Sequence, residues 1–252
     1  MEHPIIRCDN LSYKYPDGNQ ALSGVSFCLE KGSSVGIAGA NGAGKSTLLG
    51  ILCGLLEHTG GSIFLEGNQI KRSNIKALRQ KTGFVFQDPD DQLFTSSVYE
   101  DVAFGPVNMK LSKEETEARV REALEMTGIT HLAEKPPYRL SGGEKKAASI
   151  ASVLSMKPEV LIMDEPSASL DPGARRRLIE LMKKMPHTKI TASHDLDFLM
   201  EICDKVIIMS SGGIKAEGST ENILGNREIL EECGLELPLR LQGCPLCSSG
   251  GS

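Results

Sequence analysis

Short apolar runs alternate along the chain with segments whose apolar residues recur at helical spacing. This alternation predicts parallel strands joined by helices. The predicted core strands are short and mostly apolar, and they cover residues 34–38, 84–86, 160–163, 189–192 and 206–209. Residues 62–66 alternate with a period of two, which predicts part of an antiparallel edge sheet.

The middle of the chain has a different pattern, which is mainly helical from about residue 88 to residue 156. Ser112 and Glu115 have the spacing of a capping box, and Gly128 is placed to end the helix that follows. One face of this helix is apolar; it comprises Val120, Ala123, Leu124 and Thr127. We therefore expect a helical subdomain inserted into an α/β core.

Another helix is predicted to start at Asp171 and Pro172, a favourable N-cap and first-turn pair. Its apolar stripe is interpreted as core packing, and the three arginines at 175–177 as a solvated face. We expect a single domain over residues 1–233 and a flexible tail over 234–252. Within the domain, the core takes about residues 1–87 and 157–233, and the helical subdomain about 88–156.

Composition and charge exclude several classes of protein. The 252 residues, of which 40% are hydrophobic, suffice for one large domain with a packed core. A net charge of −5 and a pI near 5.6 argue against nucleic acid as the main partner. No apolar run approaches the roughly 18 residues of a membrane span, and the N-terminus lacks the features of a signal peptide. We expect a cytosolic protein that reaches a membrane only through a partner.

The seven cysteines are odd in number and irregular in spacing, which fits reduced thiols. Cys244 and Cys247 form a Cys-x-x-Cys pair, and Cys233 is a possible third zinc ligand. A closed zinc site usually needs four ligands, and no fourth is near in the sequence. Incidental cysteines are therefore favoured over a metal or redox site.

Residues 39–46 match Gly-x-x-x-x-Gly-Lys-Ser, the pattern of a phosphate-binding loop. An apolar run precedes them and a helical segment ending at Gly54 follows, which is the context that the motif requires. In such a loop the backbone N–H groups and the helix N-terminus hold phosphates, Lys45 reaches the β- and γ-phosphates, and Ser46 ligates Mg²⁺. The alternative is a glycine-rich turn without a ligand. The predicted nucleotide-binding residues of this loop are Gly39, Ala40, Asn41, Gly42, Ala43, Gly44, Lys45, Ser46 and Thr47.

A second acidic motif follows the predicted strand at 160–163, where Asp164 and Glu165 are adjacent. A strand of this kind places its last residues at the carboxyl edge of the sheet, beside the phosphate-binding loop. Asp164 can then hold Mg²⁺, directly or through water, and Glu165 can polarise a water aimed at the γ-phosphate. The alternative is an ordinary strand end followed by a solvated turn.

The order of these motifs resembles the nucleotide-binding domain of ATP-binding cassette (ABC) transporters. The discriminating segment is residues 140–144, LSGGE, which resembles that family's signature LSGGQ. Ser141, Gly142 and Gly143 at a helix N-terminus also make an anion cradle on chemical grounds alone. In the family, the signature of one subunit closes on the γ-phosphate that the other subunit holds.

Other positions match the family by position and order. Gln87 corresponds to the glutamine that senses Mg²⁺ and the attacking water, and Asp171 belongs to the loop that communicates across the dimer. His194 resembles the histidine that contacts the γ-phosphate. Tyr15 resembles the aromatic residue that stacks on adenine, with Tyr13 as a competitor. The resemblance thus implies Glu165, His194 and Gln87 as catalytic residues and Ser46, Gln87 and Asp164 as the residues that arrange Mg²⁺.

Residues 86–94 and 100–106 narrow the resemblance to the ATPases of energy-coupling-factor importers, including the cobalt and nickel systems. In that branch this region lies near the surface that grips a membrane subunit. Leu93, Phe94 and Phe104 are candidate apolar anchors; the alternative is that they pack within the helical subdomain. Glu144 and Ala147 depart from the glutamine and arginine usual in the signature segment. A longer C-terminal extension found in some members is expected to be missing.

The resemblance implies a P-loop ATPase that uses ATP and Mg²⁺ and works as a homodimer or as a heterodimer with a paralogue. Its other implied partners are integral-membrane transport subunits, which place it at the cytoplasmic face of the cell membrane. One alternative is a soluble ABC ATPase that acts in DNA repair or on ribosomes, although the long insertions or second cassette of such proteins are missing here. The other is a nucleotide-responsive soluble regulator with little turnover.

Overall fold

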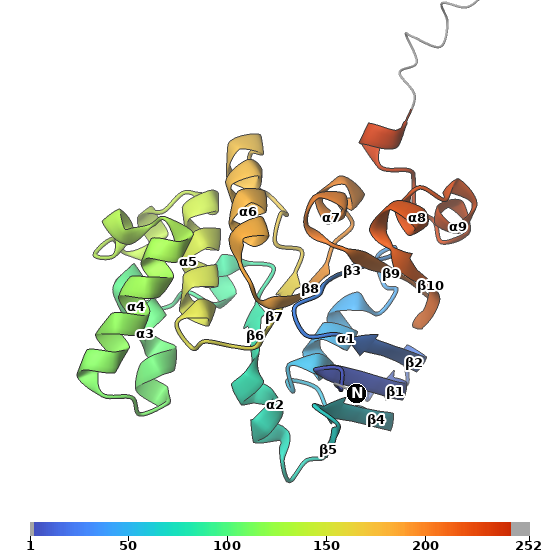
Figure 1. The fold of residues 1–252 in the computed structure, drawn as a ribbon, viewed down its shortest axis with the longest axis horizontal. Helices are drawn as coiled ribbons and strands as arrows, with labels where there is room; N and C mark the ends of the chain where they lie inside the picture. The colour runs from blue at the N-terminus through green and yellow to red at the C-terminus, as the bar shows by residue number, and fades with distance from the viewer. Residues whose placement is uncertain (1–2, 243–252) are drawn as a thin grey trace, which may run out of the picture.

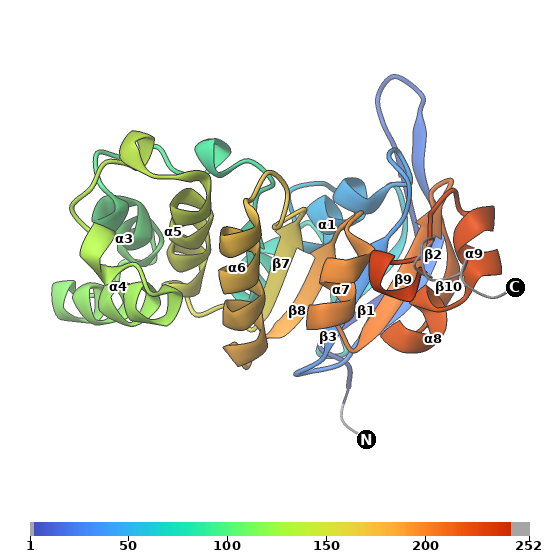
Figure 2. The ribbon, with the colours of Figure 1, turned by 90° about the horizontal axis from the view of Figure 1, so that it is seen from above.

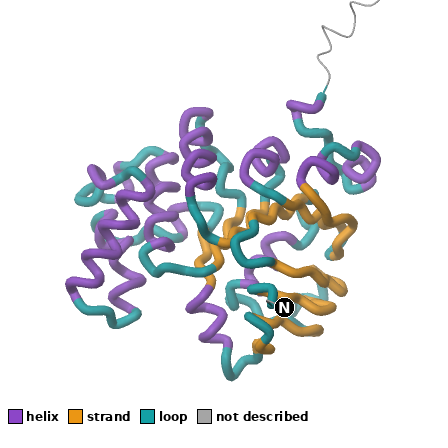
Figure 3. The backbone as a smooth tube through the Cα atoms, in the orientation of Figure 1, coloured by secondary structure: helices purple, strands orange, loops and turns teal. Residues whose placement is uncertain are grey.

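Two sheets occupy one side of the molecule and a group of helices occupies the other, as Figures 1 and 3 show for the computed structural model. The structure describes residues 3–242. The larger sheet has six strands in the spatial order β10 (Gly213–Ser219), β9 (Lys205–Ser210), β3 (Ser34–Ala38), β8 (Thr188–Ala192), β7 (Val160–Asp164) and β6 (Thr82–Val85). Neighbours from β9 to β6 are parallel, and only β10 pairs antiparallel. The predicted parallel core is confirmed.

The smaller sheet is antiparallel and has four strands in the order β2 (Gln20–Leu29), β1 (Ile6–Lys14), β4 (Gly60–Leu65) and β5 (Asn68–Ile70). Residues 62–65 of the predicted antiparallel segment lie in β4, which ends at Leu65. Helix α1 (Lys45–Leu52) lies between the two sheets (Figure 1) because its apolar side chains pack against buried residues of both. The four-stranded sheet therefore covers the side of α1 that faces away from the larger sheet.

Strands of the larger sheet such as β3, β7 and β9 divide their side chains between two hydrophobic cores. In β7, Val160 and Ile162 join the core that contains α1, whereas Leu161 and Met163 join the core on the opposite face. Successive side chains of a strand point to opposite faces, and both faces are covered, so the strands read as continuous apolar runs. This explains the sequence pattern from which the core strands were predicted.

Helices cover the face of the larger sheet opposite α1 and extend beyond one edge of it (Figure 2). A group of three stands at the β6 edge, where the sequence predicts helices. This group comprises α3 (Val98–Asn108), α4 (Lys113–Thr127) and α5 (Gly142–Leu154). The remaining helices are α2 (Ile75–Lys81), α6 (Pro172–Lys184), α7 (Leu196–Ile202), α8 (Thr220–Leu224) and α9 (Arg227–Glu232).

Two local predictions are corrected. The strand expected at 84–86 is β6 and ends at Val85, because the Phe86 N–H donates to the Gln92 side chain at 3.2 Å instead of continuing the ladder. The capping box at Ser112 is only half formed. Ser112 Oγ accepts from the Glu115 N–H at 3.2 Å, but the Glu115 carboxylate turns away and pairs with Arg119 at 2.8 Å.

The parallel strands place chemistry at one edge of the sheet. The segments that follow β3, β7 and β8 all leave the sheet at its carboxyl edge, because these three strands run in the same direction. They carry the glycine-rich turn, the pair of carboxylates and His194, respectively. Segments about 30 to 150 residues apart in the sequence are thereby brought to one site.

Candidate nucleotide site

The turn between β3 and α1 requires glycine at two positions. Gly44 has a φ of 100°, and a Cβ there would lie 2.5 Å from the Ala21 carbonyl oxygen. A Cβ at Gly39 would collide with the Met209 carbonyl oxygen. Only glycine allows the backbone to turn this tightly in front of α1. The local structure is therefore that of a phosphate-binding loop, strand then glycine turn then helix.

Lys45 is buried at the start of α1, and its ammonium group lies within the loop. It donates hydrogen bonds to the carbonyl oxygens of Gly39 at 2.7 Å and Ala40 at 3.2 Å. Phosphate oxygens are stronger acceptors for an ammonium group than carbonyl oxygens are. The loop thus presents a fixed positive charge where a triphosphate would bind.

Asp164 ends β7 as a buried carboxylate. Burial raises the pKa of this group, although the Ser46 hydroxyl and the Lys45 charge act in the opposite direction. Its Oδ1 atom is buried and has no hydrogen-bond partner in the described part of the chain. Buried polar atoms are normally paired, and carboxylate and hydroxyl oxygens are ligands that Mg²⁺ prefers. Asp164 and Ser46 therefore fit a magnesium ion.

Glu165 adopts the left-handed conformation, with a φ of 44°, and its carboxylate faces the segment that follows β8. It accepts hydrogen bonds of 3.0 Å from Ser193 Oγ and 3.0 Å from the His194 backbone N–H. The His194 Nδ1 atom lies 2.9 Å from the same carboxylate. Two of the three predicted catalytic residues, Glu165 and His194, are thus in direct contact, although they follow different strands.

A cavity of about 680 Å³ joins these features into one site. It is lined by most of the residues predicted to bind nucleotide or metal, namely Tyr15, Gly39, Ala40, Asn41, Gly42, Gly44, Lys45, Ser46, Thr47, Gln87, Asp164, Glu165 and His194. Tyr15 is held at its rim by a hydrogen bond of 2.9 Å to the Thr47 hydroxyl and by an edge-on contact with Tyr13. Ala43 does not line the cavity, because its side chain belongs to the core that contains α1.

Sequence reasoning missed five residues that line this cavity. Three belong to the turn and strand after Tyr15, namely Asn19, Gln20 and Ala21, and two belong to the C-terminal region, namely Gly234 and Leu235. Asn19, Gln20 and Ala21 follow Tyr15 closely in the sequence, and this proximity to a predicted site residue could have identified them. The last two reach the cavity through tertiary contacts that no local pattern indicates.

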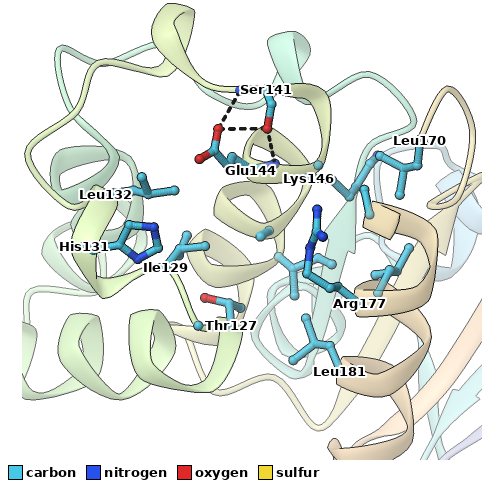
Figure 4. Close-up of a pocket in the computed structure, with 16 residues that line it drawn as sticks. Thr127, Ile129, His131, Leu132, Ser141, Glu144, Lys146, Leu170, Arg177 and Leu181 are labelled. Carbon is cyan, nitrogen blue, oxygen red and sulfur yellow. Dashed lines mark hydrogen bonds between the residues drawn. The ribbon is translucent and has the colours of Figure 1, made fainter. Parts of the chain in front are cut away.

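The predicted second anion cradle lies elsewhere. Ser141, Gly142 and Gly143 are at the N-terminus of α5, and none of them lines the nucleotide cavity. Ser141 and Glu144 form a complete capping box, in which the Glu144 carboxylate accepts from the Ser141 N–H at 2.7 Å and from its hydroxyl at 2.8 Å. These bonds, drawn in Figure 4, lower the pKa of Glu144.

Asp171 also lies outside the nucleotide cavity, at the N-cap of α6. Its carboxylate accepts from the N–H groups of Gly173 at 2.8 Å and Ala174 at 2.9 Å, as the predicted helix start requires. Arg175, expected on a solvated face, instead binds Asp195 with both arms of its guanidinium group, at 2.9 and 3.2 Å. It connects α6 to the residue that follows His194.

Gln87 enters the nucleotide cavity from the segment that follows β6. Its backbone carbonyl accepts a hydrogen bond of 2.8 Å from Lys146, on the second turn of α5. Burial lowers the pKa of Lys146 to about 8, although the charges of Asp88 and Asp164 oppose this effect. The helix that carries the second cradle is thus bonded to the segment that carries Gln87.

The candidate apolar anchors divide between interior and surface. Leu93 is buried in the core that includes α3 to α5, as the packing alternative expects. Phe94 and Phe104 are 65% and 48% exposed, and their rings meet edge to face with centroids 4.9 Å apart. They form an exposed aromatic pair on the helical group.

Two further observations concern metals and membranes. Within residues 3–242, no cluster of three or more His, Cys, Asp or Glu side chains has the arrangement of a metal site, and no helix is long and apolar enough to cross a membrane. Cys233 is buried, whereas the Cys244 and Cys247 pair lies outside the described residues.

Comparison with known proteins agrees with this geometry. The model of the ABC transporter family matches residues 22–168. A Geobacter sulfurreducens protein whose name describes an ABC transporter ATP-binding protein is 50% identical over 247 residues, covering 98% of this chain and 99% of its own length. The energy-coupling factor transporter ATP-binding protein EcfA of Carboxydothermus hydrogenoformans is 46% identical, covering 93% of this chain and 87% of its own length.

Two solved structures share the fold. CbiO1 of Clostridium perfringens, described as part of the ABC transporter complex CbiONQ, has a TM-score of 0.81 and 42% identity over 92% of this chain and 94% of its own. A dimeric ATP-binding cassette solved with ADP and phosphate has a TM-score of 0.76 and 26% identity over 85% of this chain and 98% of its own. The chain therefore belongs to the ABC transporter family of ATP-binding proteins, and it is an ATPase. Within that family its relatives support the energy-coupling factor branch.

Proposed function

We propose that the chain is the ATPase subunit of an energy-coupling-factor importer, in which two ATPase chains bind MgATP head to tail and drive uptake of a metal ion or a vitamin. One observation carries this proposal. The anion cradle at Ser141 does not line the nucleotide cavity of its own chain. A cradle separated from its own nucleotide has a use if it closes on the nucleotide of a second chain, in a homodimer or with a paralogue.

The roles of the site residues follow from their chemistry. Lys45 and the loop amides hold the phosphates, and Tyr15 offers a flat face for the adenine. Ser46, Gln87 and Asp164 would hold Mg²⁺, which when bound neutralises charge on the phosphates. Glu165 orients or activates the water, and His194, in contact with Glu165, orients the γ-phosphate. Catalysis of this kind depends mainly on positioning and charge.

Membrane subunits are the proposed partners of the helical group. We assign the division between an α/β core and a helical subdomain at about 88–156 to this task, with Phe94 and Phe104 as the exposed anchors. A peripheral position at the cytoplasmic face of the membrane follows from such a complex. The contact between Glu165 and His194 supports hydrolysis over the alternative, a soluble regulator with little turnover, because a carboxylate paired with a histidine can serve as a general base.

Mixed dimers test the head-to-tail arrangement. A Lys45→Ala chain is paired with a Ser141→Ala chain, and ATPase activity is compared with a dimer in which one chain carries both substitutions. With both on one chain, a single composite site loses its Lys45 and the other loses its Ser141. With one substitution on each chain, a single site loses both groups and the other site is intact. We expect the dimer with one substitution on each chain to keep more activity, because it retains one intact site; equal activity of the two dimers contradicts the proposal.

A further inference from the structure

Lys146 is a buried cation whose hydrogen-bond partners are all backbone carbonyls. It is 2% exposed and donates to the carbonyl oxygens of Phe86 at 3.0 Å and Gln87 at 2.8 Å. No carboxylate of residues 3–242 pairs with it within 4.0 Å. A buried ammonium group without an ion-pair partner is unfavourable for stability, so its presence between α5 and the nucleotide site requires an explanation beyond packing.

The same flank of α5 is bonded to the segment after β6 at a second point. The Gln92 side chain accepts from the Phe86 N–H at 3.2 Å and donates to Ser149 O at 2.7 Å and Ser152 Oγ at 2.8 Å. Residues 86–92 are therefore connected to α5 by hydrogen bonds at both ends. A displacement of α5 along its axis has to move this segment with it.

The side of α5 that faces α6 and the end of α4 is less tightly filled, and Lys146 and Ser141 are themselves among the residues that line the gap. A cavity of about 290 Å³ lies between α5, the end of α4 and α6 (Figure 4). Arg177 and Leu181 of α6 face it from one side, and Ile129 and His131 face it from the other. Packed interiors resist displacement, whereas a gap permits it. The helix that carries Ser141 is thus bound more firmly to the Gln87 segment than to α6.

We propose that Lys146 is a positioning residue that couples the helix of the Ser141 cradle to Gln87 in the nucleotide cavity of the same chain. When the cradle docks on the nucleotide of a second chain, α5 shifts, and Lys146 transmits the shift to the Gln87 backbone. The Gln87 side chain then takes its place beside the metal and the attacking water. This inference rests on the proposed head-to-tail dimer and adds the link between its two sites.

The test compares Lys146→Met with Lys189→Met. Lys189 is a matched control because it is also buried, at 7% exposed, and also donates to two backbone carbonyls, those of Met182 and Met185, each at 2.9 Å. Lys189 belongs to β8, and its ammonium group binds the C-terminal end of α6 instead of the segment that carries Gln87. Both substitutions keep a long side chain and remove the ammonium group, so both should change Tm similarly.

Turnover should separate the two variants. Lys146→Met is expected to lower kcat at least about tenfold, because small misplacements of catalytic groups have effects of this size, with ATP affinity within about twofold of the parent chain. Lys189→Met should keep its kcat. Lys146→Gln, which retains a donor, should fall between Lys146→Met and the parent, and it supplies the comparison if the methionine variant does not fold. A normal kcat for Lys146→Met, or an equal loss for Lys189→Met, overturns the inference.

A double variant identifies the route of the effect. In a Gln87→Ala background, Lys146→Met should lower kcat little further, because both changes interrupt the same connection. Fully additive losses contradict transmission through Gln87. Failure of the proposed function would give a different result. If Glu165→Gln keeps normal ATPase activity, the proposed catalytic site is wrong, whatever the Lys146 variants show.

Discussion

Asp164 combines burial with an oxygen atom that has no hydrogen-bond partner among residues 3–242, and this combination is what a metal-binding carboxylate would show. The free carboxylate is unfavourable because burial raises its pKa, so the nucleotide-free chain carries a local instability. Such local costs concentrate where a ligand relieves them. Its position at the end of β7 could be predicted from local sequence, since an apolar strand that ends in an acidic residue is recognisable without tertiary information.

Asp164→Asn should therefore make the fold more stable and weaken the binding of Mg²⁺. Because the folded-state pKa is raised, the ionised Asp164 destabilises the fold above its ordinary pKa, and this penalty vanishes as the pH falls below that value. The variant should raise Tm by a few degrees near neutral pH and lose this advantage in acid. The Mg²⁺ concentration for half-maximal ATPase activity should rise at least about tenfold.

Thermal unfolding across pH and a Mg²⁺ titration of turnover measure these effects. Asp91→Asn is the control, because Asp91 is an exposed carboxyl on the same side of the molecule as Gln87. An unchanged Mg²⁺ requirement in Asp164→Asn would falsify the metal assignment. A lower Tm at neutral pH would contradict the account of its burial.

Among the elements, helix starts were predicted unevenly. Ser112 and Ser141 both precede a glutamate by three residues, yet only Ser141 forms a complete capping box. Arg119 lies one turn after Glu115 and takes its carboxylate, whereas no arginine follows Glu144 at that spacing. A spacing rule identifies candidates, but the competing partner decides, and that competitor is visible in the sequence only after the helix is known.

Contacts between distant elements were beyond the sequence pattern. Lys146 in a helix pattern resembles a solvated charge, and nothing local indicates that its ammonium group reaches the carbonyls of Phe86 and Gln87. The same holds for Leu235 at the nucleotide cavity. The positions of the core strands, the turn glycines and the strand-end carboxylates are visible in local sequence patterns. The spatial order of the strands and these side-chain contacts depend on packing between segments about 40 to 190 residues apart.

The segment after α9 is fastened to α7 by Asp197. Its carboxylate accepts from the Leu239 N–H at 2.7 Å and from the Arg240 N–H and Nε at 3.2 and 2.9 Å. Burial raises the pKa of Asp197, but these hydrogen bonds outweigh it and lower the pKa overall. The attachment therefore stabilises the fold above the ordinary aspartate pKa and weakens as the pH falls through the lowered value.

Asp197→Asn should release this attachment. Hydrogen exchange at the Leu239 and Arg240 amides should become faster, and the free energy of unfolding should fall by about 1 kcal/mol, the contribution of a typical intramolecular hydrogen bond. Exchange measured by mass spectrometry at several pH values checks both. Glu228→Gln on the exposed face of α9 is the control. Equal protection of the two amides in parent and variant would show that Asp197 does not hold the segment.

At the scale of the whole molecule, the exposed aromatic pair and the nucleotide site lie on different parts of the fold. Phe94 and Phe104 belong to the helical group, whereas the cavity is built mainly from the sheet edge. Exposed aromatic side chains that meet edge to face supply compact apolar area for a partner. Partner binding and nucleotide binding should therefore be separable by mutation.

Phe94→Ser with Phe104→Ser should abolish co-purification of the membrane subunits in mild detergent while ATP binding by the isolated chain is retained. Leu55→Ser is the control, because Leu55 is 58% exposed but lies after α1, away from the helical group. Retained co-purification in the double variant would exclude this surface as the anchor. Loss of ATP binding would show that the substitutions disturb the fold instead.

The six-stranded sheet acts as a partition between two compartments of side chains. Because neighbouring residues of one strand, such as Leu161 and Ile162, belong to different compartments, substitutions accumulate on one side with little effect on the other. The amino acids of the core that includes α3 to α5 can thus change as the partners of the helical group change. The core that contains α1, next to the glycine turn, can stay the same. A cassette with 26% identity and a TM-score of 0.76 fits this freedom to diverge.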